Sequence, residues 1–255
     1  METPAPSMTT PIQANEFLAV ESLSLNYERW GQTVMALHDV SFTMPRGQWL
    51  LLVGHNGSGK SSLLRVLSGR TAPDHGLVKI NAKPASDLTT MERAEAVFLI
   101  HQDPLLGTAA DLTIFENLVV ADFQAQTGKE SRRSLHAKYE EMLTPLGLAD
   151  RMKQPVQTLS GGERQLLALL IARLRPASLI LLDEPLAALD PGKAERCLLE
   201  IADLKRMGKT IIQVTHDPKL ASTLGDRTVV MRAGEIVRDT SSHERTAEDL
   251  QNYWF

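Results

Sequence analysis

Short apolar runs that end at polar residues recur along the chain, and they predict its fold. Four of them are followed directly by glycine or polar residues: Trp49–Val53, Ala96–Ile100, Leu179–Leu182 and Ile211–Val214, the last broken by Gln213. Runs of this length are typical of buried strands, and the longer segments between them have helical length and pattern. The alternation predicts an α/β fold with a mostly parallel sheet that is covered by helices on both faces.

The polar residues after these runs form a candidate site. Each predicted strand is followed by one member of this set: Gly54, His101-Gln102, Asp183-Glu184 and Thr215-His216. Open α/β sheets bind ligands just beyond the carboxyl ends of their strands. We therefore expect these residues to lie close together at one edge of the sheet.

The stretch from residue 103 to residue 176 has no strand-like run. Helices are predicted over Asn117–Gln126 and Ser131–Leu146, and a third follows Ser160-Gly161-Gly162 and ends before Pro176. We interpret 103–176 as a helical subdomain inserted into a core formed by residues 16–102 and 177–240. Residues 1–15, with several Pro, Ser and Thr, are interpreted as a disordered leader, and residues 241–255 as a C-terminal tail.

Composition narrows the classes of function. The net charge of −4 gives no global attraction to nucleic acid, which is not expected as a partner. The single cysteine, Cys197, excludes an internal disulfide and fits a reducing compartment. The longest apolar run, Leu166–Ala172, is far shorter than the roughly 20 residues of a membrane-spanning helix, and the N-terminus lacks a signal-peptide pattern. Any membrane domain is therefore expected on other chains.

The segment Gly54-His55-Asn56-Gly57-Ser58-Gly59-Lys60-Ser61 matches the phosphate-loop pattern G-x-x-x-x-G-K-[ST] in full. Its glycines allow the backbone N–H groups to turn inward around phosphate, and the following helix directs its positive end at the same anion. In such loops the lysine, here Lys60, reaches the β- and γ-phosphates, and the hydroxyl of Ser61 ligates Mg²⁺. The preceding apolar run makes the alternative, a glycine-rich turn with an exposed lysine, a poor fit.

Two further segments carry candidate chemistry. Asp183 can ligate Mg²⁺ directly or through water, and Glu184 can polarise an attacking water, although an isolated acidic pair would more simply end a strand. Ser160-Gly161-Gly162 is a second glycine-rich helix N-terminus and suits an anion. The chain thus has two phosphate-binding ends but one lysine-bearing phosphate loop.

Four motifs follow one another along the chain: the phosphate loop, the signature segment Leu159–Gln165 (LSGGERQ), the run that ends in Asp183-Glu184-Pro185, and His216. Together they resemble the ATP-binding subunits of ABC transporters, and the resemblance extends from about Phe17 to about Val237. The resemblance implies a P-loop NTPase (RecA-like) core with an N-terminal antiparallel β part, and ATP hydrolysis coupled to transport with ATP and Mg²⁺. It also implies a head-to-tail homodimer in which each signature segment covers the partner's ATP. Permease subunits would hold the dimer at the cytoplasmic face of the membrane.

The resemblance assigns roles to further residues. Tyr27 lies where the family stacks an aromatic ring on adenine, with an exposed tyrosine at a strand end as the alternative. Ser62 matches a further phosphate contact, and Gln102 matches a glutamine that senses Mg²⁺ and touches the membrane subunits. Ala188-Leu189-Asp190 matches the family's D-loop, which implies a nucleotide contact for Asp190. His216 matches the switch histidine that contacts the γ-phosphate.

The segments His101–Thr108 and Leu112–Leu118 resemble a subgroup of import ATPases. Members of that subgroup pair with a separate permease and a solute-binding protein, and some serve tryptophan or related amino acids. Two departures are His101, where Phe is expected, and Pro185-Leu186. The alternatives are an exporter or lipid-transport subunit, or a soluble ABC ATPase of the iron–sulfur assembly type.

A contact surface for membrane subunits is expected between Gln102 and Phe115. Its turn Asp103–Thr108 carries Leu105 and Leu106 at the tip, and an isolated soluble enzyme has little reason to expose them. The alternative is that both leucines are buried under the helical subdomain.

Overall fold

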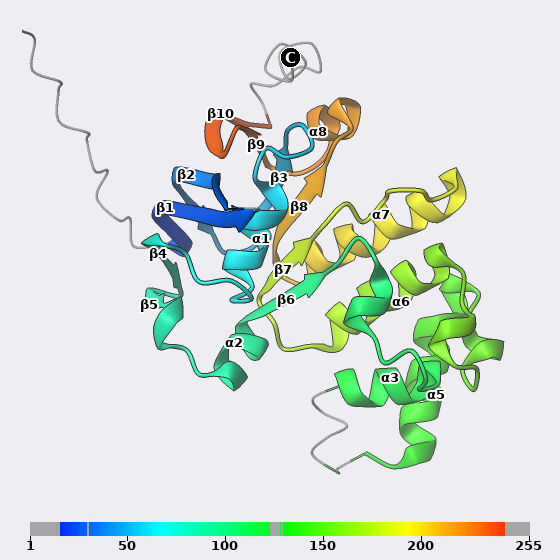
Figure 1. Ribbon diagram of the computed structural model, residues 1–255. Helices are drawn as coiled ribbons and strands as arrows, with labels where there is room; N and C mark the ends of the chain where they lie inside the picture. The colour runs from blue at the N-terminus through cyan, green and yellow to red at the C-terminus, as the bar shows by residue number, and fades with distance from the viewer. Residues whose placement is uncertain (1–15, 30, 123–127, 129, 243–255) are drawn as a thin grey trace, which may run out of the picture.

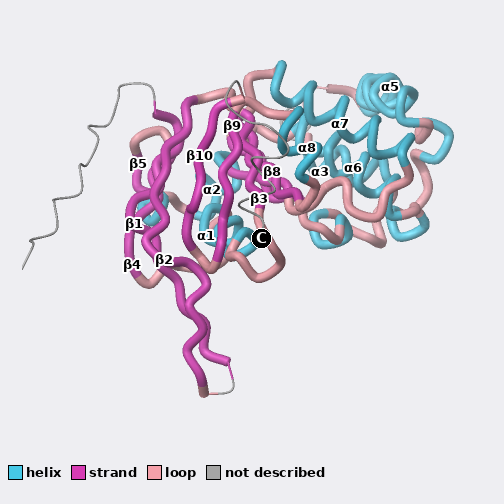
Figure 2. The backbone as a smooth tube through the Cα atoms, turned by 90° about the horizontal axis from the view of Figure 1, so that it is seen from above, coloured by secondary structure: helices cyan, strands magenta, loops and turns pink. Residues whose placement is uncertain are grey.

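The computed structural model describes residues 16–242, apart from 30, 123–127 and 129 (Figure 1). The predicted leader and all but the first two residues of the predicted tail lie outside the described residues. Two sheets stand side by side, and most of the helices cover the far face of the larger sheet (Figures 1 and 2).

The larger sheet has six strands in the order β10-β9-β3-β8-β7-β6. Their bounds are β3 Trp49–Val53, β6 Val97–Ile100, β7 Leu179–Leu182, β8 Thr210–Thr215, β9 Arg227–Arg232 and β10 Glu235–Ser241. All neighbours pair in parallel except β9 and β10, which are antiparallel. The expected mostly parallel sheet is therefore confirmed, and all four apolar runs form strands in it.

The smaller sheet is antiparallel and has the order β2-β1-β4-β5. Its strands are β1 Glu16–Arg29, β2 Gln32–Pro45, β4 His75–Ile80 and β5 Lys83–Pro84. Strands β1 and β2 form a long two-stranded ribbon that projects beyond the rest of the sheet (Figure 2). This sheet is the expected N-terminal antiparallel part.

Side chains alternate between the two faces of the six-stranded sheet and bury two separate hydrophobic clusters. In β3, for example, Leu50 and Leu52 pack toward the smaller sheet and α1 (Lys60–Leu67), whereas Trp49, Leu51 and Val53 pack toward the other helices. A strand that is apolar on both faces reads as a continuous apolar run. This explains why the core strands were visible in the sequence.

The remaining helices are α2 Thr90–Ala96, α3 Ile114–Ala121, α5 Arg132–Leu143, α6 Gly161–Leu174, α7 Pro191–Arg206 and α8 Pro218–Thr223. The prediction of a helix over Asn117–Gln126 was wrong at its start. Helix α3 begins three residues earlier because the side chains of Thr113 and Glu116 form a reciprocal capping box at its N-terminus. Residues 123–126 of that prediction lie outside the described residues.

The second predicted helix, Ser131–Leu146, is α5 followed by a short 3₁₀ helix, Thr144–Leu146. Helices α3, α5 and α6 bury their apolar faces in the same cluster as β3 and β7, so the helical region and the sheet share one core. The boundaries 103 and 176 of an inserted subdomain stay a prediction. Among the described residues, no helix is long and apolar enough to cross a membrane.

Candidate nucleotide site

The phosphate loop connects β3 to α1 and depends on glycine at two positions. Gly54 has φ +146° and Gly59 has φ +103°, in the region that side chains rarely adopt. A Cβ on Gly59 would lie 2.5 Å from the carbonyl oxygen of Ala36 in β2, and one on Gly54 would overlap the carbonyl of Met231 in β9. The loop is therefore held between the two sheets, and its glycines are required by close approach as well as by φ.

Lys60 is the first residue of α1 and is only 5% exposed. Its Nζ donates hydrogen bonds to the carbonyl oxygens of Gly54 (2.7 Å) and His55 (2.8 Å). Burial lowers the pKa of Lys60, while the negative charges of Glu184 and Asp183 act in the opposite direction. The ammonium group is thus held inside the loop, near two carboxylates that directly follow β7.

Ser61 and Asp183 place two oxygen ligands together. The Ser61 hydroxyl donates to Oδ1 of Asp183 at 3.4 Å, although the two residues are far apart in sequence. Burial raises the pKa of Asp183, a shift that the hydrogen bond from Ser61 opposes. A hydroxyl beside a half-buried carboxylate fits Mg²⁺, which uses few protein ligands and completes its shell with nucleotide phosphates and water. Among the described residues no group of three His, Cys, Asp or Glu could hold a metal.

Glu184 and His216 form a pair at the ends of β7 and β8. Oε2 of Glu184 lies 3.3 Å from Nδ1 of His216. The Glu184 side chain is 17% exposed, and that of His216 is 61% exposed. Glu184 has φ +49°, a conformation that costs a non-glycine residue roughly 1–3 kcal/mol and is typical of functional sites. The structure therefore brings Lys60, Ser61, Asp183, Glu184 and His216 to one edge of the sheet, as the strand ends predicted.

Other predicted residues of the phosphate loop region are placed as follows. His55, Asn56 and Gly57 are exposed, Ser58 is buried, and Ser62 in α1 is half-buried. Gln102, directly after β6, is exposed. The nucleotide and Mg²⁺ contacts of these residues stay predictions.

Ser160, Gly161 and Gly162 lie at the N-terminus of α6, on the opposite face of the large sheet from α1 (Figures 1 and 2). Ser160 caps the helix and Glu163 bonds back to the backbone N–H of Ser160 (2.7 Å). A Cβ on Gly162 would overlap the side chain of Lys193, so α6 and α7 approach each other closely at this glycine. The chain does not bring this segment to its own phosphate loop.

Asp190 caps α7, where its Oδ1 accepts from the backbone N–H of Lys193 (3.0 Å) and its Oδ2 lies 3.1 Å from Lys193 Nζ. Because Lys193 also packs on Gly162, Asp190 belongs to the neighbourhood of the signature segment. Sequence analysis had no signal for this contact.

Tyr27 lies within β1, opposite Val34 of β2, and is half-buried against the cluster of the smaller sheet. Its hydroxyl is buried and has no hydrogen-bond partner among the described residues. The tyrosine lies near the end of β1, as the alternative expected, but it is half-buried and not fully exposed. The adenine contact stays a prediction.

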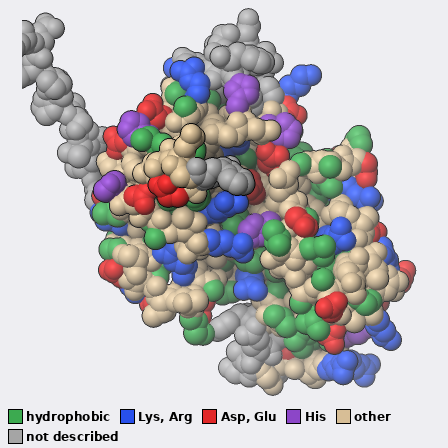
Figure 3. Space-filling model, viewed as in Figure 1, with side chains coloured by type: hydrophobic (Ala, Val, Ile, Leu, Met, Phe, Trp, Pro, Cys, Tyr) green, Lys and Arg blue, Asp and Glu red, His purple; other side chains and the backbone are tan. Residues whose placement is uncertain are grey.

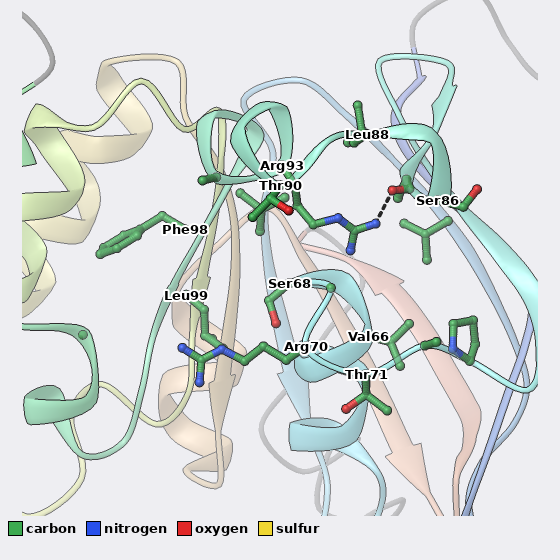
Figure 4. A pocket seen from close by; sticks show the side chains of 18 of the residues that line it. Val66, Ser68, Arg70, Thr71, Ser86, Leu88, Thr90, Arg93, Phe98 and Leu99 are labelled. Carbon is green, nitrogen blue, oxygen red and sulfur yellow. Dashed lines mark hydrogen bonds between the residues drawn. The ribbon is translucent and has the colours of Figure 1, made fainter.

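A groove of about 960 Å³ lies away from the phosphate loop, between the end of α1, α2, β6 and the 3₁₀ helix Pro104–Gly107. Its lining includes Arg70, Arg93, Arg175 and Leu106, and none of the described residues that line it is acidic. Figure 4 shows Arg70 and Arg93 reaching into it, and Figure 3 shows basic side chains gathered at the centre of this face. Sequence analysis missed these arginines because they come from three distant segments.

Comparison with known proteins shows the family to which the chain belongs. Residues 37–187 match the model of the family described as "ABC transporter". The chain is 32% identical over 91% of its length to the tyrosine transport ATP-binding protein of Clostridioides difficile, of which it covers 96%. It is also 32% identical over 94% of its length to the macrolide export ATP-binding/permease protein MacB of Bartonella henselae, but it spans only 36% of that protein.

Solved structures give the same result. A dimeric ATP-binding cassette in a post-hydrolysis state, bound to ADP and Pi, superposes with a TM-score of 0.78 and 25% identity, covering 88% of this chain and 98% of that one. The protein cbiO1 of Clostridium perfringens, part of an ABC transporter complex, superposes with a TM-score of 0.74 and 25% identity, covering 90% of each chain. The chain therefore belongs to the ABC transporter family, as an ATP-binding cassette with ATPase activity.

Proposed function

We propose that this chain hydrolyses ATP at a site built by Lys60, Ser61, Asp183, Glu184 and His216. Lys60 and the loop N–H groups bind the β- and γ-phosphates, and Ser61 and Asp183 hold Mg²⁺, which neutralises phosphate charge. Glu184 polarises the attacking water, and His216 orients Glu184 and the γ-phosphate. The observation that carries the proposal is the convergence of Ser61 on Asp183 and of Glu184 on His216 beside one phosphate loop.

We infer that the active form is a head-to-tail homodimer. The two helix ends that suit phosphate, those of α1 and α6, cover opposite faces of one sheet, so a single chain cannot close both on one nucleotide. A second copy would supply its Ser160-Gly161-Gly162 segment and Asp190 to the ATP of the first. The dimeric state of a solved relative that superposes over most of this chain supports the inference.

Two variants test the composite site. Glu184→Gln should still bind ATP but stop turnover, because an amide does not polarise the water, and it should accumulate an ATP-bound dimer visible by light scattering. Adding Ser160→Arg should return the protein to a monomer, since a bulky cation then occupies the end of α6. Wild-type hydrolysis by Glu184→Gln would remove Glu184 from its role. An ATP dimer that survives Ser160→Arg would argue against the head-to-tail arrangement.

We further propose that the groove on the face of α2 and β6 receives a cytoplasmic segment of a permease subunit, which holds the chain peripherally at the cytoplasmic face of the membrane. Leu106 lines this groove and is 65% exposed, whereas Leu105 is half-buried, so the alternative in which both leucines are buried does not apply to Leu106. Gln102 lies in the chain between the end of β6 and the 3₁₀ helix Pro104–Gly107, and in this proposal it connects the groove with the nucleotide site. Pairing with a separate permease fits the relative that this chain covers almost completely.

The proposed cargo is a small solute such as an amino acid, taken up with the help of a solute-binding protein. The relative named for tyrosine transport supports an amino acid as the cargo. Export is the second candidate, because the other relative is a macrolide export protein. Reconstitution of the chain with its permease in vesicles separates the two. ATP supplied on the side of the cassette drives solute toward that side in an importer and away from it in an exporter.

A further inference from the structure

A small cavity lies beneath the loop that follows β7, and it contains a buried amide. The cavity, of about 190 Å³, is lined by residues 184–188 of that loop and by the end of β8 with the start of α8, including Gln213 and His216. Gln213 is 0% exposed, and neither its Oε1 nor its Nε2 has a hydrogen-bond partner among the described residues. Ile211, two residues earlier in β8, packs in the helix-covered cluster, so Gln213 points to the same face.

A buried amide in a folded protein is satisfied by protein groups or by bound water. A water molecule in a cavity needs two to four polar partners and takes roughly 30 Å³, so this cavity has room for several. Its lining offers those partners: besides the Gln213 amide, they include the side chains of Glu184, His216 and Asp217. Bound water would therefore connect Gln213 to the pair that we place at the γ-phosphate.

The loop above the cavity is strained at both ends. Glu184 has φ +49° and Ala188 has φ +59°. Such conformations persist only where the surroundings over-determine them. The backbone is anchored by hydrogen bonds from Asp183 N–H to the Ile100 carbonyl (3.0 Å) and from Ala187 N–H to the Glu184 carbonyl (3.1 Å). The Glu184 carboxylate lies 3.3 Å from the His216 ring, and both residues line the cavity beneath this loop.

We propose that Gln213 is a positioning residue for ATP hydrolysis, whose amide holds bound water that fixes the orientation of the Glu184 carboxylate and the His216 ring. The inference rests on the proposed role of Glu184. Gln213 acts through this pair and does not itself contact the γ-phosphate.

The test is Gln213→Met, which preserves side-chain length and removes both polar atoms. We expect kcat to fall roughly 10- to 100-fold, because small displacements of a catalytic group carry costs of this size. The KM for ATP should stay unchanged. The melting temperature should stay close to that of the wild type, because the amide pairs with cavity water, so its removal leaves no protein donor or acceptor without a partner. Gln213→Asn, which restores an amide with space for one more water, should recover part of kcat. Ile211→Met, on the same face of β8, controls for repacking.

A purely structural role predicts a different pattern, in which kcat and melting temperature fall together in Gln213→Met and Gln213→Asn recovers neither. That pattern, or an unchanged kcat in Gln213→Met, would overturn the proposal. If Gln213 and His216 act on the same carboxylate, the double variant Gln213→Met/His216→Ala should be no slower than the slower single variant. Additive losses would contradict this. Wild-type turnover in Glu184→Gln would instead remove the underlying assignment of Glu184.

Discussion

Replacing Lys60 by alanine tests whether the buried lysine of the phosphate loop binds ATP or only supports the loop. In the structure its Nζ donates to the carbonyl oxygens of Gly54 and His55 at 2.7 and 2.8 Å. On ATP binding the ammonium exchanges some of this bonding for contacts to the β- and γ-phosphates. Hydrogen bonds to charged groups contribute about 1.5–3 kcal/mol each. The loop contacts that Lys60 gives up on binding ATP reduce this gain. We therefore expect Lys60→Ala to lose roughly 2–4 kcal/mol of ATP-binding free energy, which raises Kd about 30- to 700-fold.

The chain provides a matched control in Lys209. Its Nζ also donates to two backbone carbonyls, those of Arg175 (2.8 Å) and Ala177 (2.7 Å), and burial lowers its pKa as it does that of Lys60. Both alanine variants should therefore lower the melting temperature of the nucleotide-free protein, because two carbonyl groups lose a charged donor. Only Lys60→Ala should weaken Mg-ATP binding, measured by isothermal titration calorimetry. Equal ATP affinity in the two variants would show that Lys60 has the same structural role as Lys209 and would refute the reasoning.

Two further predictions concern the metal ligand and the groove. Burial raises the pKa of Asp183, so its charged form destabilises the nucleotide-free fold at neutral pH. Asp183→Asn should therefore raise the melting temperature at neutral pH while abolishing hydrolysis. The difference in melting temperature between the variant and the wild type should shrink as the pH falls through the range in which carboxyl groups become protonated. A variant with a lower melting temperature than the wild type at neutral pH would contradict this. Leu106→Asp should leave the melting temperature and ATP affinity of the isolated subunit unchanged, because Leu106 is 65% exposed, but should reduce recovery with permease-containing membranes. The matched control is Met207→Asp, 53% exposed at the end of α7, and equal membrane recovery of the two variants would contradict docking at the groove.

Much of the fold was predictable because its signals are local. The core strands are apolar on both faces, so they appear in the sequence as short apolar runs, of which only Ile211–Val214 is interrupted, by Gln213. The start of α3 was also a local signal, the Thr113 and Glu116 capping box, and it was overlooked in favour of hydrophobic spacing. The position of Tyr27 was harder to judge, because its burial depends on the long β1–β2 ribbon and on the cluster beneath it.

Taken alone, the sequence determined the α/β class, the phosphate loop and the identity of the polar residues at the strand ends. The α/β class and the strand ends follow from the apolar periodicity. The phosphate loop follows from its glycines, which the fold requires because φ is positive there and another strand approaches closely. Only the tertiary structure decided which of those residues meet. The contacts of Ser61 with Asp183 and of Glu184 with His216 depend on the strand order β3-β8-β7-β6. The same strand order determines the opposite placements of α1 and α6, the arginine-lined groove and the buried amide of Gln213. Packing between distant segments sets the pairing order of the strands, so the local sequence pattern does not show it.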